Sequence, residues 1–184
     1  MKKIAITALL CLTLQAQALQ ECKSESDKIN GCVEKWFYHQ SKTLWREATY
    51  QNGELSGVEK WYHKNGKIDL EVSYKEGKME GSERGYFDNG VLRSEAFYKN
   101  GKLEGTQKFY YKNGKLEGEI PYQEGKINGV AKWYERNGDL WVSVEFKDNE
   151  PISGKCRAKT PLSTPQLNRI KQDSLLSSVR RICP

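Results

Sequence analysis

The middle of the sequence contains one motif three times, first as Tyr98-Lys-Asn-Gly-Lys-Leu-Glu-Gly105. It returns as Tyr111-Lys-Asn-Gly-Lys-Leu-Glu-Gly118, and with small changes as Tyr122-Gln-Glu-Gly-Lys-Ile-Asn-Gly129. Self-similarity at a short, fixed interval is typical of repeat proteins, in which each unit packs mainly against its neighbours. The motif therefore indicates a strand–turn–strand unit that is copied along most of the chain.

Turn glycines set the period of the repeat. They lie alternately 13 and 11 residues apart, so the unit is 24 residues long and contains two different turns, at Gly53, Gly66, Gly77, Gly90, Gly101, Gly114, Gly125 and Gly138. A tyrosine column with the same 24-residue spacing holds Tyr38, Tyr62, Tyr86, Tyr110 and Tyr134. We count five repeats over Trp36 to Lys155, and we expect no insertion between Tyr38 and Phe146.

Turn chemistry and residue alternation decide the fold class. Asn-Gly and Glu-Gly favour tight hairpin turns, because these turns need positive φ angles. The segments between turns alternate with period two: Ile68, Leu70, Val72 and Tyr74 share one parity. We predict an all-β protein: a single elongated, twisted antiparallel meander sheet of ten strands, a β-hairpin repeat solenoid of five 24-residue repeats, with a C-terminal capping helix.

The repeat unit resembles MORN repeats. Units such as Tyr98-x-x-Gly101-Lys-Leu-x-Gly105 are similar to the variant form that is common in exported bacterial proteins, and the resemblance covers Trp36 to Lys155. The first repeat departs from the pattern at Ser41 and Lys42, and the last has Asn149 where glycine is expected. Bacterial proteins with this variant are often labelled antitoxin-like, so the resemblance implies a binding module that could act as an immunity protein.

The two ends of the chain predict export and caps. Residues 1–18 have a basic start, an apolar run and Ala16-Gln-Ala18, which is typical of a signal peptide cleaved after Ala18. We expect a soluble periplasmic or secreted protein with an N-terminal cap (19–35), MORN-like repeats (36–155) and a C-terminal helical cap (156–184). That helix is expected to begin with Thr164 as N-cap and to present Leu167, Ile170, Leu175 and Val179, with Arg180 and Arg181 at its end.

Four cysteines remain after the expected cleavage: Cys22, Cys32, Cys156 and Cys183. An even number in an exported chain predicts disulfide bonds. Three pairings are possible, and proximity in sequence favours Cys22–Cys32 and Cys156–Cys183, one at each end of the array. Zinc is the rival explanation, but no C-x₂-C pair is present and both histidines are distant in sequence.

The sequence shows no catalytic motif. The glycines are turn residues followed by strands, which excludes a phosphate loop, and no cysteine has a histidine partner at a catalytic spacing. His39 and His63 are 24 residues apart and are expected side by side, yet their column continues as Phe87, Tyr111 and Glu135, so we predict no metal site. We expect no enzyme and no cofactor. A net charge of +6, or +4 without Lys2 and Lys3, is spread along the chain and does not indicate nucleic acid.

The candidate binding site is a surface stripe of aromatic and basic residues: Tyr62, Tyr86, Tyr110 and Tyr134 with Lys60, Arg84, Lys108 and Lys132. These residue types are frequent in protein-binding hot spots. The basic residues also match an acidic column, Glu47, Glu71, Glu95 and Glu119, which predicts cross-strand ion pairs. Our first hypothesis is a protein-binding module, possible partners being a toxin or secreted effector. The alternative is an envelope scaffold that binds anionic lipid head groups or peptidoglycan; the sequence leaves the oligomeric state open.

Overall fold

The computed structural model describes residues 19–157, 160–172 and 183. The expected signal peptide and the end of the C-terminal helix, with Leu175, Val179, Arg180 and Arg181, lie outside these residues. The described elements, in chain order, are α1 (Glu25–Asn30), β1 (Cys32–Phe37), β2 (Leu44–Gln51), β3 (Glu54–Leu55), β4 (Gly57–Tyr62), β5 (Ile68–Lys75), β6 (Lys78–Tyr86), β7 (Leu92–Lys99), β8 (Lys102–Leu103), β9 (Gly105–Tyr110), β10 (Leu116–Gln123), β11 (Lys126–Ile127), β12 (Gly129–Tyr134), β13 (Leu140–Lys147), β14 (Glu150–Cys156) and α2 (Thr164–Gln172).

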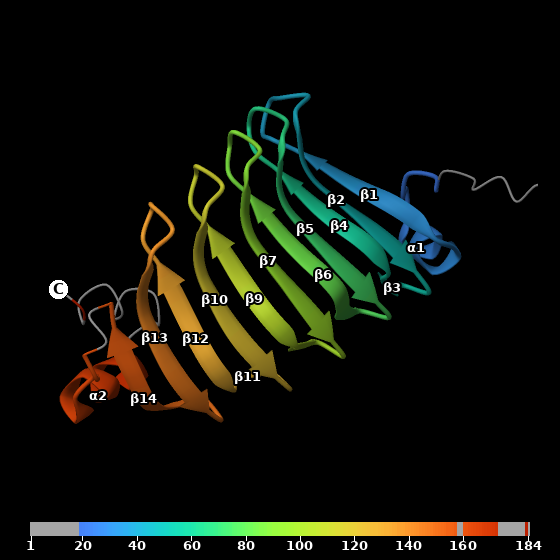
Figure 1. Ribbon diagram of the computed structural model, residues 1–184. Helices are drawn as coiled ribbons and strands as arrows, with labels where there is room; N and C mark the ends of the chain where they lie inside the picture. Colours follow the sequence, from blue (N-terminus) through green and yellow to red (C-terminus); the bar gives the residue numbers. More distant parts are fainter. Residues whose placement is uncertain (1–18, 158–159, 173–182, 184) are drawn as a thin grey trace, which may run out of the picture.

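All strands belong to one antiparallel meander sheet, as predicted (Figure 1). Neighbours in the sheet follow the chain order from β1 to β14, while β3, β8 and β11 are two-residue segments beside β2, β7 and β10. The sheet has one long strand more than the predicted ten, because β1 begins at Cys32, ahead of the expected start of the repeats at Trp36. The short segments arise where the chain kinks before Gly57, Gly105 and Gly129, all with positive φ.

Two kinds of turn alternate along the sheet, which confirms the meaning of the 11/13 spacing. The short turns place both central residues at positive φ, as at Asn100 (51°) and Gly101 (76°). The last short turn achieves this with Asp148 (52°) and Asn149 (72°) instead of glycine. In the long turns the backbone N–H of residue i donates to the carbonyl of residue i+4, as from His63 to Lys67 at 2.8 Å.

We expect Gly101→Ala to lower the free energy of unfolding by about 1–2 kcal/mol, the cost of a left-handed backbone for a residue with Cβ. Open space surrounds this position, since no atom lies within 4 Å of where the Cβ would be, so the effect isolates backbone strain. Urea unfolding followed by circular dichroism measures it. Gly101→Asn should cost less, because asparagine tolerates this conformation; equal stability of Gly101→Ala and wild type would refute the prediction.

The first long turn contains one residue more than the others, so the expected alignment of the first repeat is wrong. The N–H of Tyr38 donates to the carbonyl of Thr43, five residues on, and Phe37 pairs with Leu44 as Tyr62 pairs with Ile68. Phe37 therefore takes the place expected for Tyr38, and Tyr38 takes the place expected for His39.

A register shift beside each long turn divides the side chains between the two faces differently from simple alternation. Ile68 pairs with Tyr62 after a shift at Trp61/Tyr62, so it lies on the face of Tyr62 and not with Leu70 and Val72 as predicted. Adjacent strands share a face at paired positions. The face that carries Leu70 and Val72 has a row of paired residues that crosses the whole sheet. The row runs through Trp36, Arg46, Trp61, Leu70, Gly85, Ser94, Phe109, Gly118, Trp133, Val142 and Cys156.

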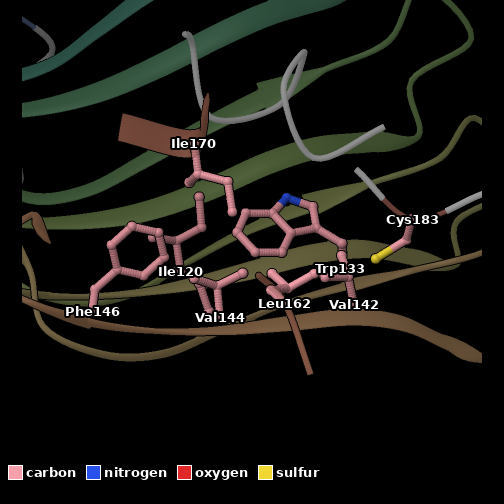
Figure 2. Close-up of a cluster of buried hydrophobic side chains, with 9 residues drawn as sticks. Ile120, Trp133, Val142, Val144, Phe146, Leu162, Ile170 and Cys183 are labelled. Atoms are coloured by element: carbon pink, nitrogen blue, oxygen red, sulfur yellow. The ribbon is translucent and has the colours of Figure 1, made fainter. Parts of the chain in front are cut away.

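Both helices pack on this face, which we call the capped face; the opposite side is the bare face. Lys28 of α1 lies over the ring of Tyr50, which pairs with Cys32 on the capped face. At the other end, Ile170 of α2 packs with Trp133, Val142 and other buried residues (Figure 2). Figure 1 places α1 and α2 at opposite ends of the sheet, so the middle of the capped face carries no described helix.

The disulfides Cys22–Cys32 and Cys156–Cys183 form as sequence proximity predicted, one at each end. The helix α2 differs in its cap: the backbone N–H and hydroxyl of Ser163 both donate to Gln166 Oε1, so Ser163 and not Thr164 is the N-cap. Leu167 and Ile170 face the core as expected.

Short segments pair with part of both outer edges of the sheet. On the outer side of β1, the N–H of Cys22 donates to the carbonyl of Val33 at 3.0 Å, and the N–H of Val33 donates to the carbonyl of Gln20 at 2.9 Å. On the outer side of β14, the N–H of Leu162 donates to the carbonyl of Gly154 at 2.9 Å. Each covering segment lies next to one of the two disulfides.

Candidate functional site

The predicted tyrosine–basic stripe is assembled on the bare face, and its tyrosine hydroxyls are already engaged. Each hydroxyl donates to the carboxylate that lies 15 residues earlier in the chain. The four bonds are Tyr62 to Glu47 (2.6 Å), Tyr86 to Glu71 (3.2 Å), Tyr110 to Glu95 (2.7 Å) and Tyr134 to Glu119 (2.9 Å). We call these eight residues the tyrosine–glutamate ladder.

The basic residues of the stripe lie opposite the same glutamates, as the sequence predicted. Lys60 reaches Glu47 at 3.6 Å, Lys108 reaches Glu95 at 3.5 Å and Lys132 reaches Glu119 at 2.9 Å, while Arg84 is paired with Glu71 in the strand register. Four acidic and four basic side chains alternate across the sheet. Their charges cancel, so the centre of the bare face has no excess of positive charge.

The ladder shifts the ionisation of its members. Burial, followed by the bond to Glu95, raises the pKa of Tyr110 to about 12. Burial is also the largest cause of the raised pKa of Tyr62, Tyr86 and Tyr134. The hydrogen bond from Lys132 lowers the pKa of Glu119, and the same bond raises the pKa of Lys132. Folding therefore favours the neutral form of the ladder tyrosines, and at Glu119 the ionised form of the carboxylate.

We expect the protein to lose stability above about pH 10, because four ladder tyrosines have a folded-state pKa above the ordinary value of 10.0. Their contribution is fully present below pH 10 and is lost as the pH rises through the folded values, about 12 for Tyr110. Tyrosinate absorbance and circular dichroism, recorded together along an alkaline titration, test this.

The control for the titration is a pair of charge-neutralising variants. Glu95→Gln removes the carboxylate that accepts the Tyr110 hydroxyl, so the pKa of Tyr110 should fall toward 10. Glu145→Gln removes an exposed carboxylate that is bonded to Ser153 and to no tyrosine, so it should leave the titration unchanged. Identical titrations for Glu95→Gln and wild type would contradict the role of the ladder.

The capped face presents a second group of aromatic and charged residues, which sequence reasoning missed. The Arg46 guanidinium lies 4.2 Å from the ring centre of Trp36 and 5.6 Å from that of Trp61, and it pairs with Glu59. Glu59 is only 2% exposed. Burial, followed by the charge of Glu59, raises the pKa of Tyr74 on the same face.

The signal that could have found this group is the same 15-residue spacing. Tyr74 follows Glu59 and Tyr98 follows Glu83 at that interval, and each carboxylate contributes, after burial, to the raised pKa of its tyrosine on the capped face. Burial and then Glu83 raise the pKa of Tyr98 to about 12. A tyrosine 15 residues after a glutamate is therefore found on both faces of the sheet, and the pairs of one face are displaced from those of the other by half a repeat.

The predicted histidine pair is not formed. His63 Nε2 lies 3.1 Å from the carbonyl oxygen of Tyr86 and 3.6 Å from Asp69, and the extra residue in the first turn puts Tyr38 where His39 was expected. Among the described residues, no group of three histidine, cysteine or acidic side chains is placed to hold a metal ion.

The larger hollows lie near the long turns and the C-terminal cap. One of about 490 Å³ is lined by Phe87, Tyr111, Lys112 and Arg136, among others. Another of about 650 Å³ is lined by Trp141, Arg157 and Cys183, among others. In the second, Arg157 is held by Glu135 and Asp139 at 2.8 Å each.

The family model described as MORN repeat variant matches four consecutive segments: 55–76, 79–100, 103–124 and 127–148. This is a MORN repeat protein. The four matched segments follow one another across the strands β3 to β13, so the repeat phase found in the sequence agrees with the family's own. MORN repeats form modules that often bind proteins or lipids.

Other comparisons give weaker likenesses. The search of curated proteins gave no match. Among solved structures, the chain is similar to the accessory secretory protein 1, 2 and 3 structure from Streptococcus pneumoniae, with 16% identity and a TM-score of 0.34, over 55% of this chain and 18% of that one. It is also similar to TarM, with 13% identity and a TM-score of 0.34, over 67% and 22%. The chain thus spans less than a quarter of each.

Within the described part of this MORN repeat protein, neither helix is long and apolar enough to cross a membrane. The two disulfides agree with the oxidising compartment that the cysteine count predicted.

Proposed function

We propose that this MORN repeat protein is an exported, non-enzymatic module that binds another protein through the middle of its capped face. The observation that carries the proposal is the gap between the two caps. There, the partly exposed aromatic side chains of Trp61 and Tyr98 lie on strands that no described helix covers, and Phe109 follows at the edge of the buried C-terminal cluster. Aromatic residues presented on a rigid scaffold are the typical anchors of a protein interface.

The charge distribution of the bare face favours a protein partner over an anionic lipid surface. Its lysines and Arg84 alternate with glutamates, so the stripe first suggested as a lipid site carries no net positive charge in its centre. Binding to anionic lipid depends on clustered basic residues near the surface. An envelope scaffold that binds lipid head groups or peptidoglycan remains the alternative.

The more specific form of the proposal is an immunity protein. A stiff single-layer sheet, held at both ends by disulfides, can cover the active site of a secreted toxin without any chemistry of its own. Preorganisation of this kind reduces the entropy lost on binding. If the gene next to this one encodes a secreted effector, deletion of this protein should make cells sensitive to that effector; indifference to every neighbouring gene product would exclude the immunity role.

A capture experiment with two matched variants tests where and what the protein binds. Phe109 lies on the capped face, whereas Phe97 is 51% exposed on the bare face. The mature protein, Phe109→Ala and Phe97→Ala are immobilised and exposed to envelope extract. We expect a partner that is retained by wild type and Phe97→Ala and lost with Phe109→Ala. Loss with Phe97→Ala alone would move the interface to the bare face.

The alternative is tested with vesicles. The mature protein is sedimented with liposomes of anionic lipid and with purified sacculi at low and high salt. Salt-sensitive pelleting together with no captured protein would favour the envelope scaffold over the protein-binding module.

A further inference from the structure

The first repeat of the capped face contains a complete binding arrangement for a guanidinium group. The Arg46 side chain stacks on Trp36 and Trp61 and pairs with the carboxylate of Glu59. The charge of the same carboxylate contributes, after burial, to the raised pKa of Tyr74 on this face. Stacking on aromatic rings and pairing with a carboxylate are the two interactions for which a planar guanidinium is best suited.

One repeat later, the same positions keep the acidic half of this arrangement and lose the cation. Adding 24 to each number replaces Glu59 by Glu83 and Tyr74 by Tyr98, and both new residues lie on the capped face. Arg46 becomes Leu70 and Trp61 becomes Gly85. Glu83 takes part in none of the ion pairs that join described residues.

The nearest basic side chain on this face is engaged elsewhere. Arg93 lies against Gly85, where a Cβ would be 3.1 Å from its Nη2 atom, but its ion pair is with Asp69 at 3.3 Å. In the following repeat the acidic position is Gln107, so Glu83 is the last carboxylate of this row. The partly exposed Glu83 therefore lies on β6 in the middle of the uncovered face, on the same face as Gly85, without a cation of its own.

We propose that Glu83 binds an arginine side chain supplied by the partner protein, in the way that Glu59 binds Arg46 within this chain. This inference rests on the proposed function, and it adds the chemistry of the partner: an exposed arginine flanked by apolar residues. The guanidinium lies over Leu70, which is placed between Trp61 and Gly85, and it pairs with the Glu83 carboxylate. The charge complementarity is the same as that already present one repeat earlier.

A peptide titration tests this without knowledge of the partner. The probe is a capped leucine–arginine–leucine tripeptide, and the matched probe replaces arginine by citrulline, which is isosteric and uncharged. Binding to the oxidised mature protein is followed by amide and indole NMR shifts. We expect the arginine peptide to move the signals of Trp61, Glu83 and Gly85, and to bind about tenfold or more tightly than the citrulline peptide.

Four variants separate the proposal from a general attraction. Glu83→Gln should lose the preference for arginine, whereas Glu145→Gln, the same charge change on the bare face, should keep it. Leu70→Arg recreates the internal pair of the first repeat, so it should block the arginine peptide while retaining a well-dispersed spectrum. Arg93→Ala removes a positive charge that repels the bound guanidinium, and it should tighten binding.

The outcomes also separate this inference from the proposed function. Equal binding of both peptides, or an unchanged preference in Glu83→Gln, would overturn the arginine site even if envelope capture yields a partner that needs Phe109. Arginine-selective binding with no captured protein would instead count against the proposed function alone.

Discussion

Trp133→Ala is expected to cause the largest loss of stability of any single substitution in the described core, about 3–5 kcal/mol. Trp133 is 2% exposed and packs with Val142, Val144 and Ile170 where α2 meets the sheet (Figure 2). Its indole also lies directly over Gly118, whose Cβ would be 3.0 Å from the ring. Alanine would remove the buried indole and its contacts with these residues.

Unfolding in guanidinium, followed by circular dichroism and by tryptophan fluorescence, measures this effect. Trp45→Ala is the matched control, because Trp45 is 42% exposed and its removal should cost little. Trp133→Phe should retain much of the stability, since the indole Nε1 has no hydrogen-bond partner among the described residues and the contribution comes from packing. If Trp133→Ala and Trp45→Ala unfold at the same denaturant concentration, the described core does not hold the C-terminal cap.

Glu59→Ala is expected to have the second largest effect, about 2–3 kcal/mol. Breaking a buried pair by removal of one partner costs about 3–5 kcal/mol, because the other charge is left unpaired; the expected cost here is lower because the Arg46 side chain is 23% exposed and water can solvate it. Chemical denaturation of the single variants measures it.

A second substitution distinguishes an unpaired charge from a simple loss of contacts. Arg46→Met combined with Glu59→Met replaces the pair by apolar side chains and should recover most of the stability lost in Glu59→Ala. Glu83→Ala is the control one repeat later, where no guanidinium is buried, and it should be nearly neutral. A double variant as unstable as Glu59→Ala would show that the pair matters for shape rather than charge.

The sequence predicted the sheet well because short-range chemistry decides it. Asn-Gly pairs require positive φ, and the alternation of 11 and 13 residues distinguishes the two turn types. The disulfide pairing followed from the cysteines' positions at the two ends. The lysine–glutamate pairs followed from residues that lie opposite each other in a regular register.

The errors arose where the backbone departs from regularity. The positions predicted for Tyr38 and His39 were wrong because the first long turn contains an additional residue. The prediction rested on counting 24 residues between repeats, and this cannot detect an insertion inside a degenerate repeat. A period-two pattern cannot reveal the register shift that moved Ile68 to the other face. The apolar residues Ile68 and Leu70 are two positions apart, as in a regular strand, so the pattern places both on one face.

The candidate site was only half visible in the sequence. The stripe of tyrosines and basic residues was found, but the partners of its hydroxyls were not, because they belong to strands 15 residues away. The capped-face group around Glu59 was missed because a buried carboxylate has no local signature: its burial depends on Arg46, which comes from the neighbouring strand.

The terminal segments along β1 and β14 have a consequence for aggregation. An uncovered edge strand can recruit another chain and begin a fibre. In this protein a short segment of the chain pairs with part of each edge strand, residues 20–22 with β1 and residues 160–162 with β14, and a disulfide lies beside each: Cys22–Cys32 and Cys156–Cys183. We therefore expect the two disulfides to oppose polymerisation, because their reduction would allow both edge strands to lose these segments and pair with other chains.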